Sequence, residues 1–149
     1  MRAVVQRVKE SSVKVQGNIV GSIGSGFTVF LGVGKDDNEE DVKYLKDKII
    51  NLRVFEDEGE KMNFSLKDVE GDLLVVSQFT LFGDCRKGRR PNFMNALGGA
   101  EAERLYELFI AECKKEVSFV ASGSFGADME VHIINDGPVT IILDSKKTF

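Results

Sequence analysis

Short hydrophobic and alternating stretches fill the first third of the chain and predict β-strands. Gly17-Asn18 lies between two of them as a hairpin-turn sequence, and further glycines interrupt the later ones. Runs of roughly four to eight residues with period-two alternation, bounded by turn residues, are typical of strands. We therefore predict that this region forms a β-meander. Its expected strands are residues 3–8, 12–15, 19–23 and 27–33.

The hydrophobic spacing becomes helical in two segments. An acidic turn at 39–41 precedes apolar residues at helical spacing, which predicts a helix from Asn38 to about Leu52, since negative charge stabilises the positive end of a helix dipole. A similar apolar stripe predicts a second helix from about Ala100 to Lys115. The remaining strand-like stretches are residues 53–55, 73–81, 117–121, 130–134 and 139–143.

These elements predict the fold class. Strands outnumber helices and do not alternate regularly with them, which favours an α+β fold. A length of 149 residues with 42% hydrophobic residues fits one domain with a sizeable core. We therefore predict a single compact domain over residues 1–149, with a mainly antiparallel or mixed, barrel-like sheet and two main helices.

Composition limits the class of protein. No apolar run approaches the roughly 20 residues of a membrane span, and the first residues enter a strand pattern without a signal peptide, so we expect a cytoplasmic protein with no membrane partner. Cys85 and Cys113 fit neither a disulfide framework nor a metal site, because His132 is the only histidine, and we expect free thiols. The net charge of −4 argues against binding nucleic acid through overall charge but allows a local basic patch.

Two short patterns resemble functional motifs but have simpler explanations. The Gly-Val-Gly-Lys segment 32–35 lacks the spacing of a phosphate loop and precedes two aspartates that would repel a phosphate, so we expect a turn and no nucleotide cofactor. His132 could belong to a Ser/His/Asp arrangement, but the sequence contains no G-x-S-x-G elbow to supply its serine. On an alternating strand it shares a face with Glu130 and Ile134, and we expect it to be structural or exposed.

The predicted strand 73–81 carries polar side chains at Ser77, Gln78 and Thr80. Period-two geometry places Ser77 and Thr80 on opposite faces, so both can enter one pocket only if the strand bends or ends between them. One interpretation is a plain sheet strand whose hydroxyls satisfy neighbouring backbone groups. The other is a functional site, because Gly83 ends the strand and a cationic loop follows.

This loop carries basic side chains that could bind phosphate, since arginine offers a planar fork to phosphate oxygens. A solvated surface loop would have the same composition, so both interpretations stay open. The basic residues are Arg86, Lys87, Arg89 and Arg90.

Residues 135–140 predict a tight turn between two strands. The X-Pro bond is trans by default and cis in about one in twenty cases in folded proteins, so the sequence leaves the isomer open. Gly137 has no side chain and Pro138 has no backbone N–H. This corner would therefore offer a ligand carbonyl oxygens and little else.

Four segments, in this order, resemble the successive motifs of the D-aminoacyl-tRNA deacylases. The resemblance also includes residues 5–8 and 31–33, so it spans essentially the whole chain. Asn92 departs from the family pattern, in which Ser follows Arg-Arg-Pro, and its role stays open. The segments are Ser77-Gln78-Phe79-Thr80-Leu81, Lys87-Gly88-Arg89-Arg90-Pro91-Asn92-Phe93, Gly126-Ala127-Asp128-Met129 and Asn135-Asp136-Gly137-Pro138-Val139-Thr140.

The resemblance implies an enzyme that hydrolyses the ester between a D-amino acid and the 3′-terminal adenosine of tRNA and rejects L-aminoacyl-tRNA. It implies a homodimer with active sites at the subunit interface, and no metal or organic cofactor. The basic loop would bind tRNA. The pocket would be lined by Ser77, Gln78, Phe79 and Thr80, with a cis Gly137-Pro138 entering from the partner subunit.

The chemistry of an aminoacyl ester is compatible with so sparse a site. The ester is already activated, so orienting a water and stabilising the oxyanion can suffice. We expect backbone N–H groups near Gln78 and Phe79 to form the oxyanion hole. Thr80 is either a nucleophile or a group that positions water and substrate, and we favour positioning, since no base is visible to activate its hydroxyl. Rigid carbonyls at Gly137-Pro138 would leave room for a D side chain only. Glycine has no side chain to exclude, so glycyl-tRNA, including tRNA(Ala) mischarged with glycine, is also an expected substrate.

Two other functions remain open. A non-catalytic tRNA-binding module would use the basic loop alone and bind in a salt-dependent manner without cleaving the ester. An editing enzyme for an L-amino acid mischarged to tRNA would show the opposite stereochemical preference. No DNA partner is expected.

Overall fold

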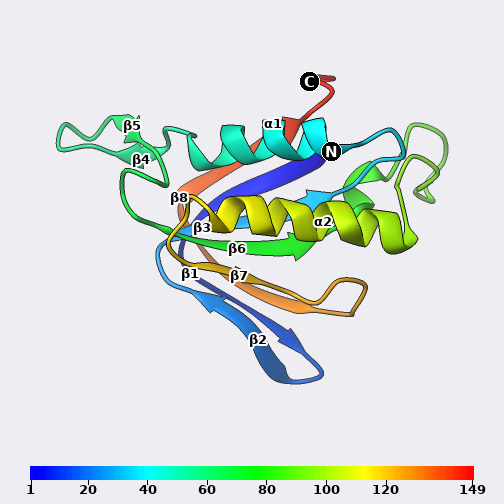
Figure 1. The fold of residues 1–149 in the computed structure, drawn as a ribbon, viewed down its shortest axis with the longest axis horizontal. Helices are drawn as coiled ribbons and strands as arrows, with labels where there is room; N and C mark the ends of the chain where they lie inside the picture. The colour runs from blue at the N-terminus through cyan, green and yellow to red at the C-terminus, as the bar shows by residue number, and fades with distance from the viewer.

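The computed structural model describes residues 1–149, which form a main sheet, a small hairpin and two α-helices (Figure 1). The main sheet contains β1 (Arg2–Val15), β2 (Asn18–Ile23), β3 (Gly26–Gly32), β6 (Asp72–Ser77), β7 (Val120–Ser122) and β8 (Glu130–Asp144). The hairpin and helices are β4 (Phe55–Glu56), β5 (Met62–Phe64), α1 (Glu39–Ile50), the 3₁₀-helix η1 (Phe79–Phe82) and α2 (Gly99–Lys114). Neither α-helix is long and apolar enough to cross a membrane.

β1 is the central strand of the sheet. β2 and β3 both pair antiparallel with it, and the pairs Ser11–Ile23 and Val8–Gly26 keep the same register, so β2 and β3 lie along one edge of β1. The predicted meander is wrong here, because β3 pairs with β1 and not with β2. The reason is the length of β1, whose 14 residues continue through the polar residues 9–12 and offer partners to both strands.

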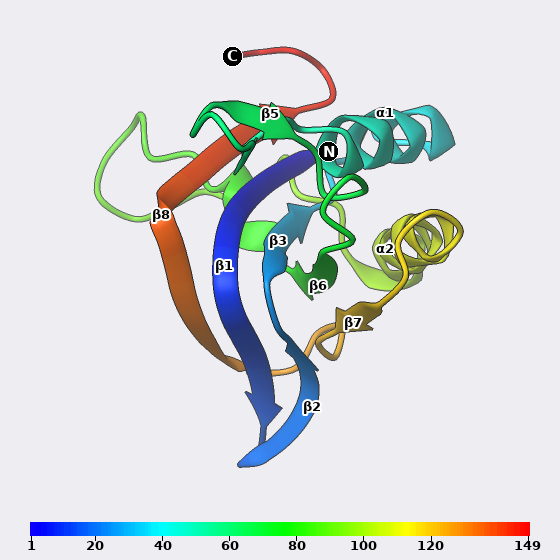
Figure 2. The ribbon, with the colours of Figure 1, turned by 90° about the vertical axis from the view of Figure 1, so that its left-hand side faces the viewer.

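The sheet combines parallel and antiparallel pairs. β6 pairs parallel with β3, and β7 pairs parallel with β6. β8 pairs antiparallel with β1 and has no second strand beside it. Figure 2 shows these strands side by side in a strongly curved sheet. The prediction of an α+β domain with a mixed, barrel-like sheet is confirmed.

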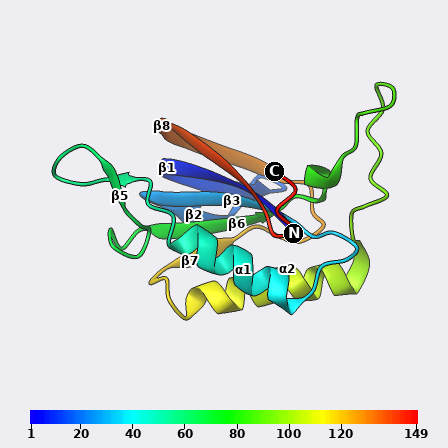
Figure 3. The ribbon, with the colours of Figure 1, turned by 90° about the horizontal axis from the view of Figure 1, so that it is seen from above.

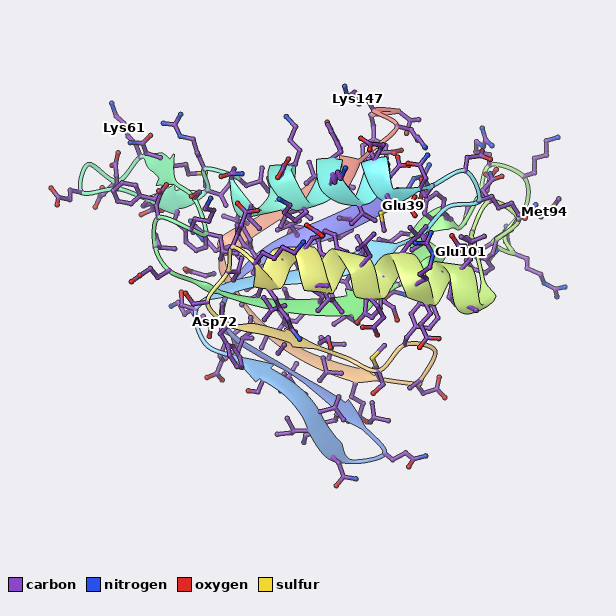
Figure 4. The ribbon with its side chains drawn as sticks, in the orientation of Figure 1. Glu39, Lys61, Asp72, Met94, Glu101 and Lys147 are labelled. Carbon is purple, nitrogen blue, oxygen red and sulfur yellow. The ribbon has the colours of Figure 1, made fainter.

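The two helices lie side by side on one face of the sheet (Figures 1 and 3). α1 begins directly after Asn38, with the acidic first turn that predicted it, and the Asn38 side chain caps the helix by accepting from the Glu40 N–H at 2.9 Å. Arg104 of α2 joins the helices by an ion pair to Glu39 of α1 at 2.8 Å, and it also pairs with Glu101 of its own helix at 2.6 Å. Figure 4 labels Glu39 and Glu101 on the facing helices. Both predicted helices are therefore confirmed, with ends displaced by one or two residues.

β6 is buried on both faces, which fixes the position of its carboxyl end. Leu73 and Val75 belong to the core cluster between the sheet and the helices. Leu74 and Val76 belong to a second cluster on the other face of the sheet. Because both faces of β6 are tightly packed, the end of this strand has a fixed position, and the residues that follow Val76 start from it.

Several predicted strand boundaries are wrong. The strand expected over 73–81 ends at Ser77 and continues as η1, and 53–55 and 117–121 are strands only in part. The expected turn at 135–140 lies inside β8: Gln6 pairs with Thr140 and Val8 with Asn135, so residues 136–139 bulge opposite Arg7. A β-bulge of this kind keeps a strand in the sheet while displacing its extra residues.

Candidate active site

A largely apolar cavity of about 620 Å³ opens where β6 ends. Its wall is built from the β6–η1 junction, the segment that leads into α2, and residues 125–129. Hydrophobic residues make up 12 of the 18 that line it. A cavity of this size, with few polar groups, is the usual form of a small-molecule site.

The polar residues singled out in the sequence lie at this cavity. Ser77, Gln78 and Phe79 line it, whereas Thr80 is exposed beside it and is linked to it by a hydrogen bond from Gln78 Nε2 to Thr80 Oγ1. The strand ends between Ser77 and Thr80, which is the condition under which both can serve one site. The Gln78 N–H makes the last bond to β3, donating to the Leu31 carbonyl at 2.8 Å.

This bond corrects part of the expected oxyanion hole, because the Gln78 N–H is already used within the sheet. The next two N–H groups, of Phe79 and Thr80, begin a 3₁₀-helix, and the first N–H groups of a helix have no intrahelical acceptor. The helical bonds start with the Leu81 N–H, which donates to the Gln78 carbonyl at 3.3 Å. Phe79 and Thr80 are therefore the backbone donors available to a ligand.

The cavity wall contains no histidine, lysine or cysteine, and Asp128 is its one ionisable side chain. No group of three His, Cys, Asp or Glu side chains is placed to hold a metal ion. His132 is exposed on β8, as are Glu130 and Ile134 on the same face, which confirms its assignment as an exposed strand residue. The site can orient and hydrogen-bond a ligand, but its wall offers no strong base.

The basic loop lies beyond η1 and is closed by a pair of backbone hydrogen bonds between Asp84 and Asn92, at 2.8 and 2.9 Å. The Arg86 guanidinium is bound by Asp84, and this pairing lowers the pKa of the Asp84 carboxyl to about 2. All four predicted basic residues are exposed, but only Lys87, Arg89 and Arg90 lack an acidic partner. Asn92 lies at the base of the loop, where its side chain accepts a hydrogen bond from the Met94 N–H at 2.8 Å.

Gly137 and Pro138 are joined by a cis peptide bond, the isomer that the family resemblance implied. Both are exposed, and neither lines the cavity of its own chain. Their bulge lies opposite Arg7 of β1. Ser77 pairs with Leu31 of β3, which pairs in turn with Ala3 of β1, four residues away from Arg7. Four residues of strand correspond to roughly 13 Å, so within one chain the two predicted parts of the site are apart.

Arg7 anchors the bulge through its guanidinium group. Its buried guanidinium donates to the Asp136 carbonyl at 3.1 Å and to the Val54 carbonyl at 2.5 Å, and it forms an ion pair with the Asp136 carboxylate at 3.6 Å. Gly137 has a φ of +124°, and a Cβ there would lie 3.0 Å from an Arg7 nitrogen. Arginine and glycine together set the position of the Gly-Pro backbone.

A family model described as D-Tyr-tRNA(Tyr) deacylase matches residues 4–144. The chain belongs to this family. D-aminoacyl-tRNA deacylases of Clostridium botulinum (strain Loch Maree / Type A3) and Clostridium perfringens (strain SM101 / Type A) are 68% and 66% identical to it, over 100% of each chain.

Solved structures share the fold of this deacylase-family chain. One, named c-Myc DNA Unwinding Element Binding Protein, has a TM-score of 0.92 and 44% identity, with 97% of this chain and 98% of that chain covered. Another, described as a probable eukaryotic D-amino acid tRNA deacylase, has a TM-score of 0.79 and 20% identity, with 95% and 97% covered. At that identity the second likeness shows the fold alone.

The deacylase-family site also contains residues that sequence reasoning missed. Arg2 at the start of β1 donates to the Leu81 carbonyl at 3.0 Å, lies 4.7 Å from the centre of the Phe82 ring and pairs with Asp144 at 3.5 Å, so it holds the end of η1. Phe93 and residues 125–129 complete the cavity wall. Phe93 and residues 126–129 belong to the segments that carried the family resemblance, but no role in the site was predicted for them. Nothing in a strand pattern identifies Arg2.

Proposed function

We propose that this protein is a D-aminoacyl-tRNA deacylase, which hydrolyses the ester between a D-amino acid and tRNA and releases both. The observation that carries the proposal is an apolar cavity walled by Ser77, Gln78 and Phe79 and flanked by a basic loop. The cavity can take an aminoacyl-adenosine end, and the loop can hold the phosphates that precede it. Relatives that bear this name are identical to the chain at about two thirds of its positions over their full length.

The proposed chemistry needs only orientation and hydrogen bonding. An aminoacyl ester is a reactive acyl group, and the tetrahedral intermediate formed when water attacks it carries a negative oxygen. The N–H groups of Phe79 and Thr80 stabilise that oxygen, since they lie next to the cavity and have no helical acceptor. The intermediate then collapses as the bond between the acyl carbon and the 3′-oxygen breaks, and that oxygen leaves as a hydroxyl with a proton supplied by the water. Ser77 and Gln78 orient the ester and the water. In this mechanism no side chain is acylated.

Thr80 is assigned a positioning role, because its hydroxyl accepts a hydrogen bond from the Gln78 amide and forms no hydrogen bond with a basic side chain. Thr80→Ala is therefore expected to keep measurable activity, with kcat/KM lowered by about tenfold, the usual scale of one lost neutral hydrogen bond. Thr80→Ser should lie closer to wild type. Single-turnover hydrolysis of D-tyrosyl-tRNA measures both, and complete loss of cleavage with tRNA binding intact would instead identify a nucleophile.

The protein acts as a homodimer in this proposal, with Gly137 and Pro138 of one chain completing the cavity of the other. Three observations support it: these residues are exposed, they lie apart from their own cavity, and β8 has a free edge. Ile134 and Ile142 of the same strand are 50% and 61% exposed, which suits burial against a second copy. The dimer acts in the cytoplasm, where tRNA is charged.

Handedness is set in this arrangement by carbonyl oxygens at Gly137 and Pro138, which hold the substrate amino group and leave no space for an L side chain. Glycine has no side chain to exclude, so glycyl-tRNA, including tRNA(Ala) mischarged with glycine, is expected to be hydrolysed as well. The check is a titration of enzyme against glycyl-tRNA(Ala) and D-tyrosyl-tRNA. Glycyl-tRNA that survives enzyme levels which clear the D-ester would contradict this filter.

Lys87, Arg89 and Arg90 are free to bind phosphate, whereas Arg86 is paired with Asp84. Arg89→Ala and Arg90→Ala are each expected to weaken tRNA binding and to lower the slope of log affinity against log salt by about 1. Arg86→Ala is the matched control, with a smaller change in slope. Filter binding across a salt series measures all three, and unchanged slopes would assign the arginines to structure.

The proposal is tested by incubating purified protein with D-tyrosyl-tRNA and separating charged from uncharged tRNA on an acid gel. Release of free tRNA at a rate proportional to enzyme supports hydrolysis. Salt-dependent binding with no release would identify a tRNA-binding module. Cleavage of a mischarged L-aminoacyl-tRNA alone would identify an editing enzyme.

A further inference from the structure

Two partly exposed aromatic rings meet in the cavity wall on the side of the basic loop. Phe79 is 55% exposed and Phe93 is 37% exposed, and their ring centres lie 5.2 Å apart at an interplanar angle of 69°. Both line the cavity. Met94, next to Phe93, is 68% exposed and lies at the end of the molecule where the loop projects (Figure 4). Neighbouring exposed apolar side chains at a cavity mouth indicate a binding surface.

This aromatic pair is held in place by its backbone. A Cβ at Gly83 would lie 3.0 Å from the Phe93 ring, so the absence of a side chain there lets the ring pack closely. The Phe93 carbonyl accepts from the Ala96 N–H at 3.0 Å, and Asn92 is bonded to Asp84 on the other side. The rings are thus presented at little further cost in conformational entropy.

Charge on the adjoining loop indicates the chemistry of the ligand. Arg90, the last of the unpaired cations Lys87, Arg89 and Arg90, is separated from Phe93 by only Pro91 and Asn92. Aromatic faces beside mobile cations are the usual means of binding single-stranded nucleic acid, with bases on the rings and phosphates on the cations. The aromatic pair also lines the cavity whose wall includes Ser77 and Gln78.

We propose that Phe79 and Phe93 form a stacking platform for the single-stranded nucleotides that precede the terminal adenosine of tRNA. The inference rests on the proposed function, because it needs the aminoacyl-adenosine in the cavity. The direction of the tRNA strand across the protein is then fixed. The ester lies at Ser77, the penultimate cytidine lies on the rings, and the earlier phosphates run toward Arg89 and Arg90. The platform adds affinity for tRNA without reading the body of the molecule.

The test compares D-tyrosyl-adenosine with a D-tyrosyl-CCA trinucleotide as substrates of the full-length protein. Stacking of one base on an aromatic side chain contributes about tenfold or more in affinity, so wild type is expected to prefer the trinucleotide by about tenfold in kcat/KM. Phe93→Ala should lose most of this preference. Phe93→Tyr should keep it, whereas Phe93→Leu, which fills a similar volume without an aromatic face, should lose it.

Combining the protein variant with an altered substrate, as in a double-mutant cycle, identifies the base that is stacked. An abasic residue at the penultimate position should lower cleavage by wild type as much as Phe93→Ala does, and it should have no further effect on that variant. Phe64→Ala is the matched control, since Phe64 is 39% exposed on β5, at the end of the molecule where Figure 4 labels Lys61. It should leave the substrate preference unchanged.

Equal cleavage of the two substrates by wild type would overturn the platform and leave the proposed function standing. So would an equal loss on both substrates in Phe93→Ala with the preference intact. Cleavage of neither substrate would remove the proposed function and the platform with it. Thermal unfolding of each variant accompanies the kinetics, and Phe93→Leu, which retains more of the apolar side chain than alanine, carries the test if Phe93→Ala unfolds.

Discussion

Arg7→Met is expected to lower the free energy of unfolding by about 3 kcal/mol, the scale of a buried charged partner removed from its acceptors. The change leaves the Val54 and Asp136 carbonyls without their donor, and the Asp136 carboxylate without its cation. Methionine keeps much of the apolar length of arginine, so the loss reports polar contacts more than packing. Urea denaturation at fixed protein concentration measures it.

Arg104→Met is the control for this prediction. Arg104 makes ion pairs with Glu39 at 2.8 Å and Glu101 at 2.6 Å, both shorter than the 3.6 Å pair of Arg7 with Asp136, but its side chain is 48% exposed. Exposed pairs contribute about 0 to 1 kcal/mol, because water solvates the separated charges. Equal destabilisation by the two substitutions would contradict the account of Arg7 as the anchor of the bulge.

Gly137→Ala is expected to reduce hydrolysis of D-tyrosyl-tRNA by about a hundredfold, because a displacement of about 1 Å in a positioning group has effects of this size. A Cβ at this position would lie 3.0 Å from both Arg7 and Val139, and the φ of +124° is strained for any residue with a side chain. The Gly-Pro carbonyls must therefore move. Single-turnover kinetics with the D-ester measures the loss.

Gly17→Ala separates this effect from backbone strain in general. Gly17 also has a positive φ, +80°, but a Cβ there would meet nothing within 4 Å, and it lies in the hairpin turn away from the cavity. It is expected to cost about 1 kcal/mol of stability and to leave hydrolysis unchanged. Similar activity losses in both variants would show that the Gly-Pro position is unimportant.

The helices and the fold class could be predicted because their signals are local. The acidic turn at 39–41 and the apolar stripes that define α1 and α2 depend on sequence neighbours alone. The pairing of β3 with β1, and the bulge inside β8, depend on contacts between distant segments. An apolar run that continues past Ser77 has the composition of a strand, and the sequence alone did not show that it turns into η1.

The candidate site was predicted in part. Ser77, Gln78 and Phe79 were identified by their polar setting and by the family resemblance, and they do line one cavity. The Gln78 N–H, one of the expected oxyanion donors, already donates to the Leu31 carbonyl, and that bond follows from sheet register. Arg2 and Arg7 act through carbonyl oxygens from remote segments, which leave no pattern in the sequence.

The most direct measurement is the rate of hydrolysis of matched D- and L-tyrosyl-tRNA by the purified protein, with a chelator present. The account predicts rapid loss of the D-ester, a rate for the L-ester close to that of buffer alone, and no effect of the chelator. Equal cleavage of both esters would contradict the role of the Gly-Pro carbonyls. Cleavage of neither ester, with tRNA still bound, would contradict the assignment of the cavity as an active site.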